Sequence, residues 1–141
     1  MRPGIIAAML ASALPGAALA AADLPAGPAG DIPVEEWRAM AGGRTVTYRI
    51  DGALWALERY FAGNRVQLQL YDGSCLDGTW SYEAPHYCFH WEGQGTSCFR
   101  HARVGGAIVV IQTQDGSDTP LTQDVTAVTD TPLDCGPPAT S

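Results

Sequence analysis

Histidines are the first residues to consider for metal binding or acid–base chemistry, and the chain has three. His86 and His90 stand four residues apart in a segment that alternates like a β-strand, which separates them by about 13 Å. His101 falls on the opposite face of the same predicted hairpin. Because the three side chains do not converge on one ion, we expect no bound metal and no cofactor.

Carboxylates and hydroxyls offer a second route to catalysis. Asp72 and Asp77 have the residue type of a glycosidase pair or of calcium ligands. Each begins an Asp-Gly dipeptide, for which turn formation is the simpler explanation. Ser74, Ser97 and Ser117 lie in predicted turns or a hairpin, and the chain has no Gly-x-Ser-x-Gly motif. The sequence therefore predicts that the protein is not an enzyme.

Two charged residues, Glu58 and Arg59, interrupt an otherwise apolar segment over residues 54–61. A charge that points into a protein interior needs a partner, because burying it alone is costly. Two interpretations stay open. The pair forms a polar floor together with Arg49 or Arg103, or it faces water.

Aromatic side chains are the candidates for a binding site. One face of three consecutive predicted strands carries Trp80, Tyr82, Tyr87, Phe89, Trp91 and Phe99. Such a cluster buries a large apolar area and is expected to form the core. We predict a filled core with a shallow pocket at its open end, near Trp55 and Tyr60. The predicted ligand-binding residues are Trp55, Tyr60, Trp80 and Trp91.

The four cysteines are even in number, and their spacing lacks the Cys-x-x-Cys pair typical of zinc sites. We predict two disulfides, Cys88 with Cys98 across a hairpin and Cys75 with Cys135, which ties the C-terminal tail to the strands. The first pairing places His86 opposite Arg100 and His90 opposite Thr96. It also puts the cysteines on a face that is outward or partly covered by another segment, because Tyr87 and Phe89 occupy the core face.

The elements that must position these residues are mostly short strands. Residues 33–41 have helical spacing of apolar side chains after a proline, and Gly42-Gly43 end that pattern. From Arg44 onward apolar and polar residues alternate with a period of two, which is typical of strands. Acidic-Gly dipeptides that predict turns begin at residues 51, 72, 77, 92 and 115. The prediction is an all-β domain with one short N-terminal helix. Its strands form a small antiparallel up-and-down barrel, or a strongly curled meander, of seven to eight strands.

The N-terminus has the pattern of a secretory signal peptide. A positive Arg2, an apolar stretch and the small residues 18–20 predict cleavage after Ala20. We expect a signal peptide over 1–20, a flexible leader over 21–32, a single barrel-like domain over 33–135 and a disordered tail over 136–141. The protein is then periplasmic or secreted, where disulfides are stable, and has no stable membrane insertion after cleavage.

The net charge of the chain excludes some classes of binding partner. Without Arg2 the chain has seven arginines, no lysine and fifteen acidic residues, a formal charge of −8. Such a surface repels phosphate backbones, so we expect no nucleic acid. The remaining candidate partners are a small apolar ligand or an envelope protein.

Part of the chain resembles a family of small exported bacterial β-domains of uncharacterised function. The resemblance covers about residues 36–113. It depends on Gly43-Arg44-Thr45 with Tyr48, Tyr60-Phe61, Asp72-Gly73-x-Cys75-x-x-Gly78-x-Trp80, Cys88-Phe89-x-Trp91 and Cys98. Gly78-Thr79-Trp80 also resembles the Gly-x-Trp of lipocalin and avidin-like barrels, in which a Trp closes one barrel end. The resemblance implies a β-barrel and no catalytic residues.

Two functions remain open at this stage. The first expectation is a structural or protein-interaction module of the cell envelope, whose barrel is filled by its own aromatic side chains. The alternative is a lipocalin-like carrier that holds a small apolar or amphipathic ligand in an aromatic-lined pocket. An eight-stranded barrel suits either, because its bore accommodates side chains or one small ligand. An ordered, open cavity would favour the carrier.

Overall fold

The computed structural model describes residues 19–20 and 24–136 and has the predicted all-β architecture. The barrel consists of β3 (Thr45–Ile50), β4 (Ala53–Tyr60), β5 (Arg65–Leu70), β6 (Cys75–Glu83), β7 (His86–Trp91), β8 (Gly95–Val104), β9 (Ala107–Gln114) and β10 (Ser117–Thr129). The helix is α1 (Val34–Ala41), and two short strands, β1 (Leu19–Ala20) and β2 (Gly30–Asp31), pair with β10 and β8.

The sheet closes into a ring because its last strand also pairs with its first. Neighbouring strands pair antiparallel in chain order, and β10 is long enough to contact β9 with its first part and β3 with its second. Asp51 and Gly52, both with positive φ, form the turn between β3 and β4. The predicted up-and-down barrel is confirmed.

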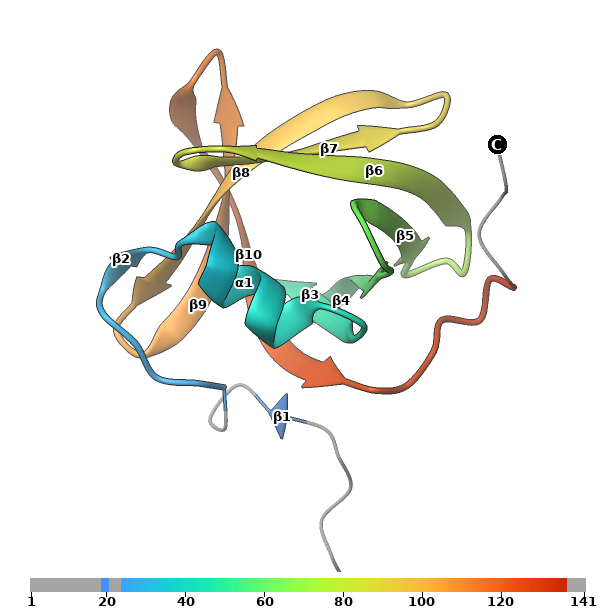
Figure 1. Cartoon of the computed structure of the whole chain (residues 1–141), viewed down its shortest axis with the longest axis horizontal. Coiled ribbons are helices and arrows are strands. Elements are labelled where there is room, and N and C mark those ends of the chain that lie inside the picture. The colour runs from blue at the N-terminus through green and yellow to red at the C-terminus, as the bar shows by residue number, and fades with distance from the viewer. Residues whose placement is uncertain (1–18, 21–23, 137–141) are drawn as a thin grey trace, which may run out of the picture.

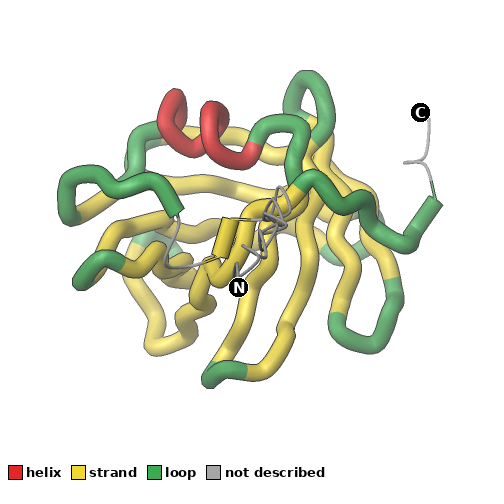
Figure 2. The backbone as a smooth tube through the Cα atoms, turned by 90° about the horizontal axis from the view of Figure 1, so that it is seen from below, coloured by secondary structure: helices red, strands yellow, loops and turns green. Residues whose placement is uncertain are grey.

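Helix α1 covers one end of this barrel. Figure 1 shows α1 in front of the ring of strands, and Figure 2 shows it across the upper end of the strands. Its buried face consists of Trp37, Met40 and Ala41. The ring centroid of Trp37 lies 6.0 Å from that of Tyr60 and 4.4 Å from that of His101. Trp37 thus fills the barrel end beneath the helix.

The segment before α1 lies against the barrel, which differs from the flexible leader expected over residues 21–32. Ile32 is 1% exposed, and its amide donates a hydrogen bond to a carbonyl of β8 at 2.8 Å. The Arg103 side chain donates to the Pro25 carbonyl at 3.0 Å. The expectation considered the Pro and Gly content but overlooked Ile32, whose burial offsets the cost of ordering the chain. Residues 21–23 lie outside the described part.

The predicted chain ends fall mostly outside the described residues. Of the expected signal peptide, only Leu19 and Ala20 are described, as β1. Of the expected tail over 136–141, only Gly136 is described. Cleavage after Ala20 would remove β1 and leave intact the pairing of β3 with β10 that closes the barrel. No helix in the described ranges is long and apolar enough to cross a membrane.

The Cys88–Cys98 disulfide joins β7 to β8 at directly opposed positions, as predicted. The predicted register is confirmed as well, since His86 lies opposite Arg100. Tyr87 on the alternate face is fully buried, whereas the two cysteines are half-buried. The aromatic face of this hairpin is therefore the inner face of the barrel.

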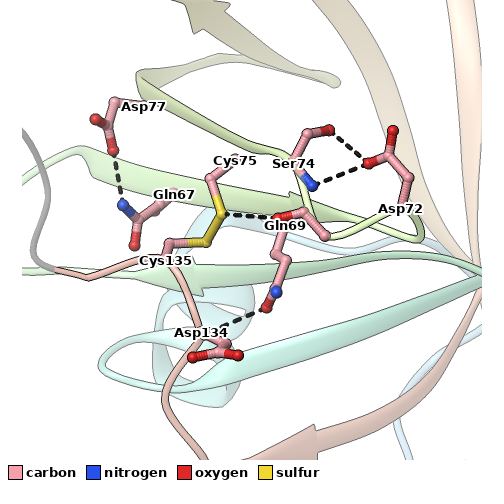
Figure 3. The surroundings of a disulfide bond; sticks show 9 residues. Gln67, Gln69, Asp72, Ser74, Cys75, Asp77, Asp134 and Cys135 are labelled. Carbon is pink, nitrogen blue, oxygen red and sulfur yellow. Dashed lines mark hydrogen bonds between the residues drawn. A yellow bond between two sulfur atoms is a disulfide. The ribbon is translucent and has the colours of Figure 1, made fainter.

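The Cys75–Cys135 disulfide, also as predicted, ties the residues after β10 to the beginning of β6. Figure 3 shows the C-terminal segment beside β5 and β6. There the Asp134 amide donates a hydrogen bond to the Gln69 side-chain oxygen at 3.1 Å. Asp134 and Cys135 are thus held against β5 and β6 by a hydrogen bond and a covalent bond.

Candidate functional site

The barrel interior is filled at the α1 end and open at the other. The filled end contains the fully or nearly fully buried Trp37, Val46, Tyr60, Val66, Trp80, Tyr87, Ile108 and Val128. Beyond these residues lies a cavity of about 480 Å³. Its lining comprises Tyr48, Ile50, Trp55, Glu58, Leu68, Leu70, Leu76, Phe89, Trp91, Gln94, Ser97, Phe99, His101, Val110, Gln112, Leu121 and Gln123. The volume falls in the range of small-molecule sites.

The cavity wall is mainly aromatic and aliphatic. Phe89 and Trp91 have stacked rings with centroids 5.9 Å apart, and Phe99 meets Phe89 edge-on at the same separation. Gly78 stands opposite Trp91 on the adjacent strand. A Cβ atom added at Gly78 would lie 2.7 Å from the Trp91 ring, so the absence of a side chain there leaves room for the indole.

Glu58 is buried within this apolar interior, at 4% exposure. Its Oε1 atom accepts hydrogen bonds from the Tyr48 hydroxyl at 2.8 Å and the Tyr60 hydroxyl at 2.5 Å. The expected arginine partners are wrong, because Arg49 donates to a turn carbonyl and Arg103 pairs with α1. Two neutral phenols, rather than a cation, hold the carboxyl group in place.

Burial raises the pKa of Glu58 from its ordinary value of 4.5 to about 7. Hydrogen bonds from Tyr60 and Tyr48 favour the ionised carboxylate and partly offset this rise. Burial, followed by the nearby Glu58 charge, raises the pKa of both tyrosines well above 10. The tyrosines therefore remain neutral donors, while Glu58 changes charge near neutral pH.

We predict that Glu58 makes the stability of the ligand-free protein fall with rising pH. Its pKa is higher in the folded than in the unfolded state, so its contribution is complete below about 4.5 and is lost as pH rises through about 7. The measurement is the free energy of unfolding of the wild type and of Glu58→Gln, by denaturant titration between about pH 4 and pH 8. The difference between the two proteins should change by up to about 1.4 kcal/mol per pH unit in this window.

The comparison with Glu58→Gln is needed because His101 changes the free energy of unfolding with pH in the opposite direction. Burial lowers the pKa of His101 to about 3, so the unfolded state gains its proton first and stability is lost as pH falls below about 6.5. His101 is present in both proteins and its effect largely cancels in the comparison. A difference between wild type and Glu58→Gln that does not vary with pH would contradict the prediction.

His101 is the second buried polar group of the cavity. It is 1% exposed, and neither ring nitrogen has a hydrogen-bond partner among the described residues. Its ring packs against Trp37 and Tyr87, at centroid separations of 4.4 and 4.1 Å. A neutral imidazole in this state offers one donor and one acceptor that the protein leaves unused.

The predicted ligand-binding residues divide into two groups. Trp55 and Trp91 line the cavity. Trp80 belongs to the filled end, where its ring stacks with Tyr87 and lies under the Arg38 guanidinium at 4.6 Å. Tyr60 is not part of the lining and contacts the site through its hydroxyl, which is hydrogen-bonded to Glu58 and lies 3.5 Å from that of Tyr48.

The other charged side chain of that segment, Arg59, donates to the Thr45 hydroxyl at 3.2 Å and to the Asp130 carbonyl at 3.3 Å. It takes no part in the lining of the cavity. Of the two neighbouring charges weighed from the sequence, Glu58 alone enters the interior site.

The other candidate residues have local roles. Asp72 accepts hydrogen bonds from the backbone amide and hydroxyl of Ser74, as expected of a turn, and these bonds lower its pKa (Figure 3). Asp77 accepts from the Gln67 side chain at 2.9 Å. The His90 ring is hydrogen-bonded within the outer face of the hairpin. In the described ranges, no group of three or more histidines, cysteines or acidic residues is arranged to hold a metal ion.

A second hollow, of about 640 Å³, lies on the outside of β7, β8 and β9 around the Cys88–Cys98 disulfide. It is larger than the interior cavity, but no Trp, Tyr or Phe lines it. The interior cavity combines an apolar wall with a few convergent polar groups, which is the usual composition of a ligand site. We therefore take it as the candidate functional site. No family model, no curated protein and no solved structure matches this chain.

Proposed function

We propose that the protein is an exported carrier or binding protein that holds one small amphipathic molecule inside its barrel. The observation that supports this function best is the cavity of about 480 Å³, enclosed by strands and lined by Trp55, Trp91 and Phe99. Polar side chains of the lining, among them Glu58 and Gln123, supply the groups that orient a ligand. The proposal corresponds to the lipocalin-like carrier rather than to a barrel filled by its own aromatic side chains.

Export is part of the same proposal. Two disulfides within 141 residues favour an oxidising compartment, in agreement with the signal peptide expected from the sequence. We propose the periplasm or the extracellular medium as its location.

A matched pair of substitutions tests the carrier function. Ser97 lies opposite the inward-facing Phe89 and lines the cavity, whereas Ser81 is exposed on the outside and lies opposite Cys88. Ser97→Phe should fill the binding space and weaken the binding of 2-naphthylmethanol, an apolar alcohol of suitable size, at least about 10-fold. Ser81→Phe adds the same ring on the surface and should leave affinity unchanged.

Titration calorimetry with the oxidised, full-length mature protein provides the measurement. Circular dichroism establishes that both variants are folded before affinities are compared. Equal loss in both variants, or equal retention in both, would place the binding outside the cavity. Failure of the wild type to bind 2-naphthylmethanol, its amine and its carboxylate alike would contradict the proposed function as a whole.

A further inference from the structure

Glu58 has no countercharge among the residues that the structure describes. Both tyrosine hydroxyls donate to the same oxygen, Oε1, and no hydrogen bond among the described residues involves Oε2. The described residues that line the cavity include no arginine, and the chain has no lysine. A buried carboxylate that is neither paired with a cation nor fully hydrogen-bonded is costly to maintain. Protonation removes this cost, and so does a bound cation that supplies the missing positive charge.

The surroundings of Glu58 suit a ligand that supplies that charge. Trp55, Trp91 and Phe99 present aromatic rings to the cavity, and such rings attract cations as well as apolar groups. The neutral His101 ring also lines the cavity, so Glu58 meets no second charge there. The protein carries a formal charge of −7, which raises the local concentration of cations.

We propose that the cavity binds a small amphipathic organic cation, a primary or secondary amine, whose ammonium group contacts the Glu58 carboxylate while its apolar body packs against the aromatic wall. This inference rests on the proposed carrier function. Tyr48 and Tyr60 orient the carboxylate, and they are positioning residues rather than direct contacts of the cation.

Three naphthalene probes of nearly equal size test the charge preference. They are 2-naphthylmethylamine as the ammonium, 2-naphthylmethanol as the neutral isostere and 2-naphthoate as the anion. By titration calorimetry at pH 8, where Glu58 is mostly ionised, the wild type should bind the ammonium at least about 10-fold more tightly than the alcohol. 2-Naphthoate should bind most weakly, because its carboxylate would lie next to the negative charge of Glu58.

The variants locate the source of the preference. Glu58→Gln preserves shape and removes the charge, so it should weaken binding of the ammonium by about 10-fold to 100-fold and leave that of the alcohol nearly unchanged. Glu92→Gln is the matched control, because Glu92 is exposed and lies outside the cavity lining. It removes the same charge and should change neither affinity appreciably.

The outcomes separate the two proposals. If the alcohol binds in the cavity but the ammonium binds no better, or if Glu58→Gln weakens both probes equally, the amine preference is overturned while the carrier function stands. If Glu92→Gln weakens the ammonium as much as Glu58→Gln does, the preference comes from overall charge and not from the buried carboxylate. Absence of binding of all three probes overturns the carrier function itself.

Discussion

Replacing Trp80 by alanine is expected to lower the free energy of unfolding by about 3 to 5 kcal/mol. The side chain is 3% exposed and belongs to the filled end of the barrel. Its ring meets Tyr60 edge-on and Tyr87 in a stack, with centroid separations of 5.9 and 6.1 Å. Removing the indole would leave a void between these rings, because the closed barrel and α1 restrict how far the neighbours can move.

Trp55 is the matched control for this substitution. It is also a tryptophan on an inner barrel surface, but it is half-buried and lines the cavity. Since solvent or ligand already occupies one side of the ring, Trp55→Ala should cost less than half as much stability while weakening naphthalene binding. Denaturant titration gives the stabilities and calorimetry gives the affinities. If Trp80→Ala retains wild-type stability but abolishes binding, the division of the barrel into a filled and an open half is wrong.

That division was only partly predictable from the sequence. Alternation over Tyr87, Phe89 and Trp91 identified the inner face of β7, because a strand between two neighbours must place alternate side chains on the same side. The register of β7 and β8 followed from one disulfide, since Cys88 and Cys98 have to lie opposite each other. Local patterns therefore sufficed for the strands and for the direction in which their side chains point.

The alternation of side chains did not reveal at which level along the barrel axis each inward-facing residue lies. Trp80 and Trp91 both point inward, yet one lies at the filled end and the other lines the cavity, because the register places Trp91 opposite Gly78, one inward position along β6 from Trp80. The end that is filled depends on Trp37, which α1 inserts from outside the sheet. The alternation of side chains along a strand does not indicate which end of the barrel the helix covers.

The partners of Glu58 were missed for a similar reason. Reasoning from charge favoured an arginine, since opposite charges compensate each other. The signal for the actual partners was a spacing of two, which places Tyr60 on the same face of β4 as Glu58. Tyr48 then joins from β3, where it lies opposite Ala56, one inward position from Glu58. Cross-strand neighbours of this kind become visible once the pairing of β3 with β4 is known.

Breaking the Cys75–Cys135 bond is expected to destabilise the protein more than breaking Cys88–Cys98. The first closes a loop of 60 residues and the second one of 10. In the chain-entropy model, loops of these lengths correspond to about 4 and about 3 kcal/mol. Each pair is changed to serine, and the free energies of unfolding of the two double variants are compared with that of the wild type.

The long link also acts in the folded state, because it holds the residues after β10 against β6. Without it, the residues after β10 keep polar contacts such as the Arg44–Asp130 ion pair at 3.4 Å, which is exposed and weak. The Thr45 hydroxyl also donates to the Thr131 carbonyl at 2.5 Å, close to where β10 closes on β3. These contacts alone hold the residues after β10 less firmly, so loosening of this segment should extend to the closing pair of strands.

Hydrogen exchange at β3 and β10 is therefore expected to accelerate in Cys75→Ser/Cys135→Ser and not in Cys88→Ser/Cys98→Ser. If the two double variants are equally stable, the long disulfide does not stabilise the protein by lowering the entropy of the unfolded chain.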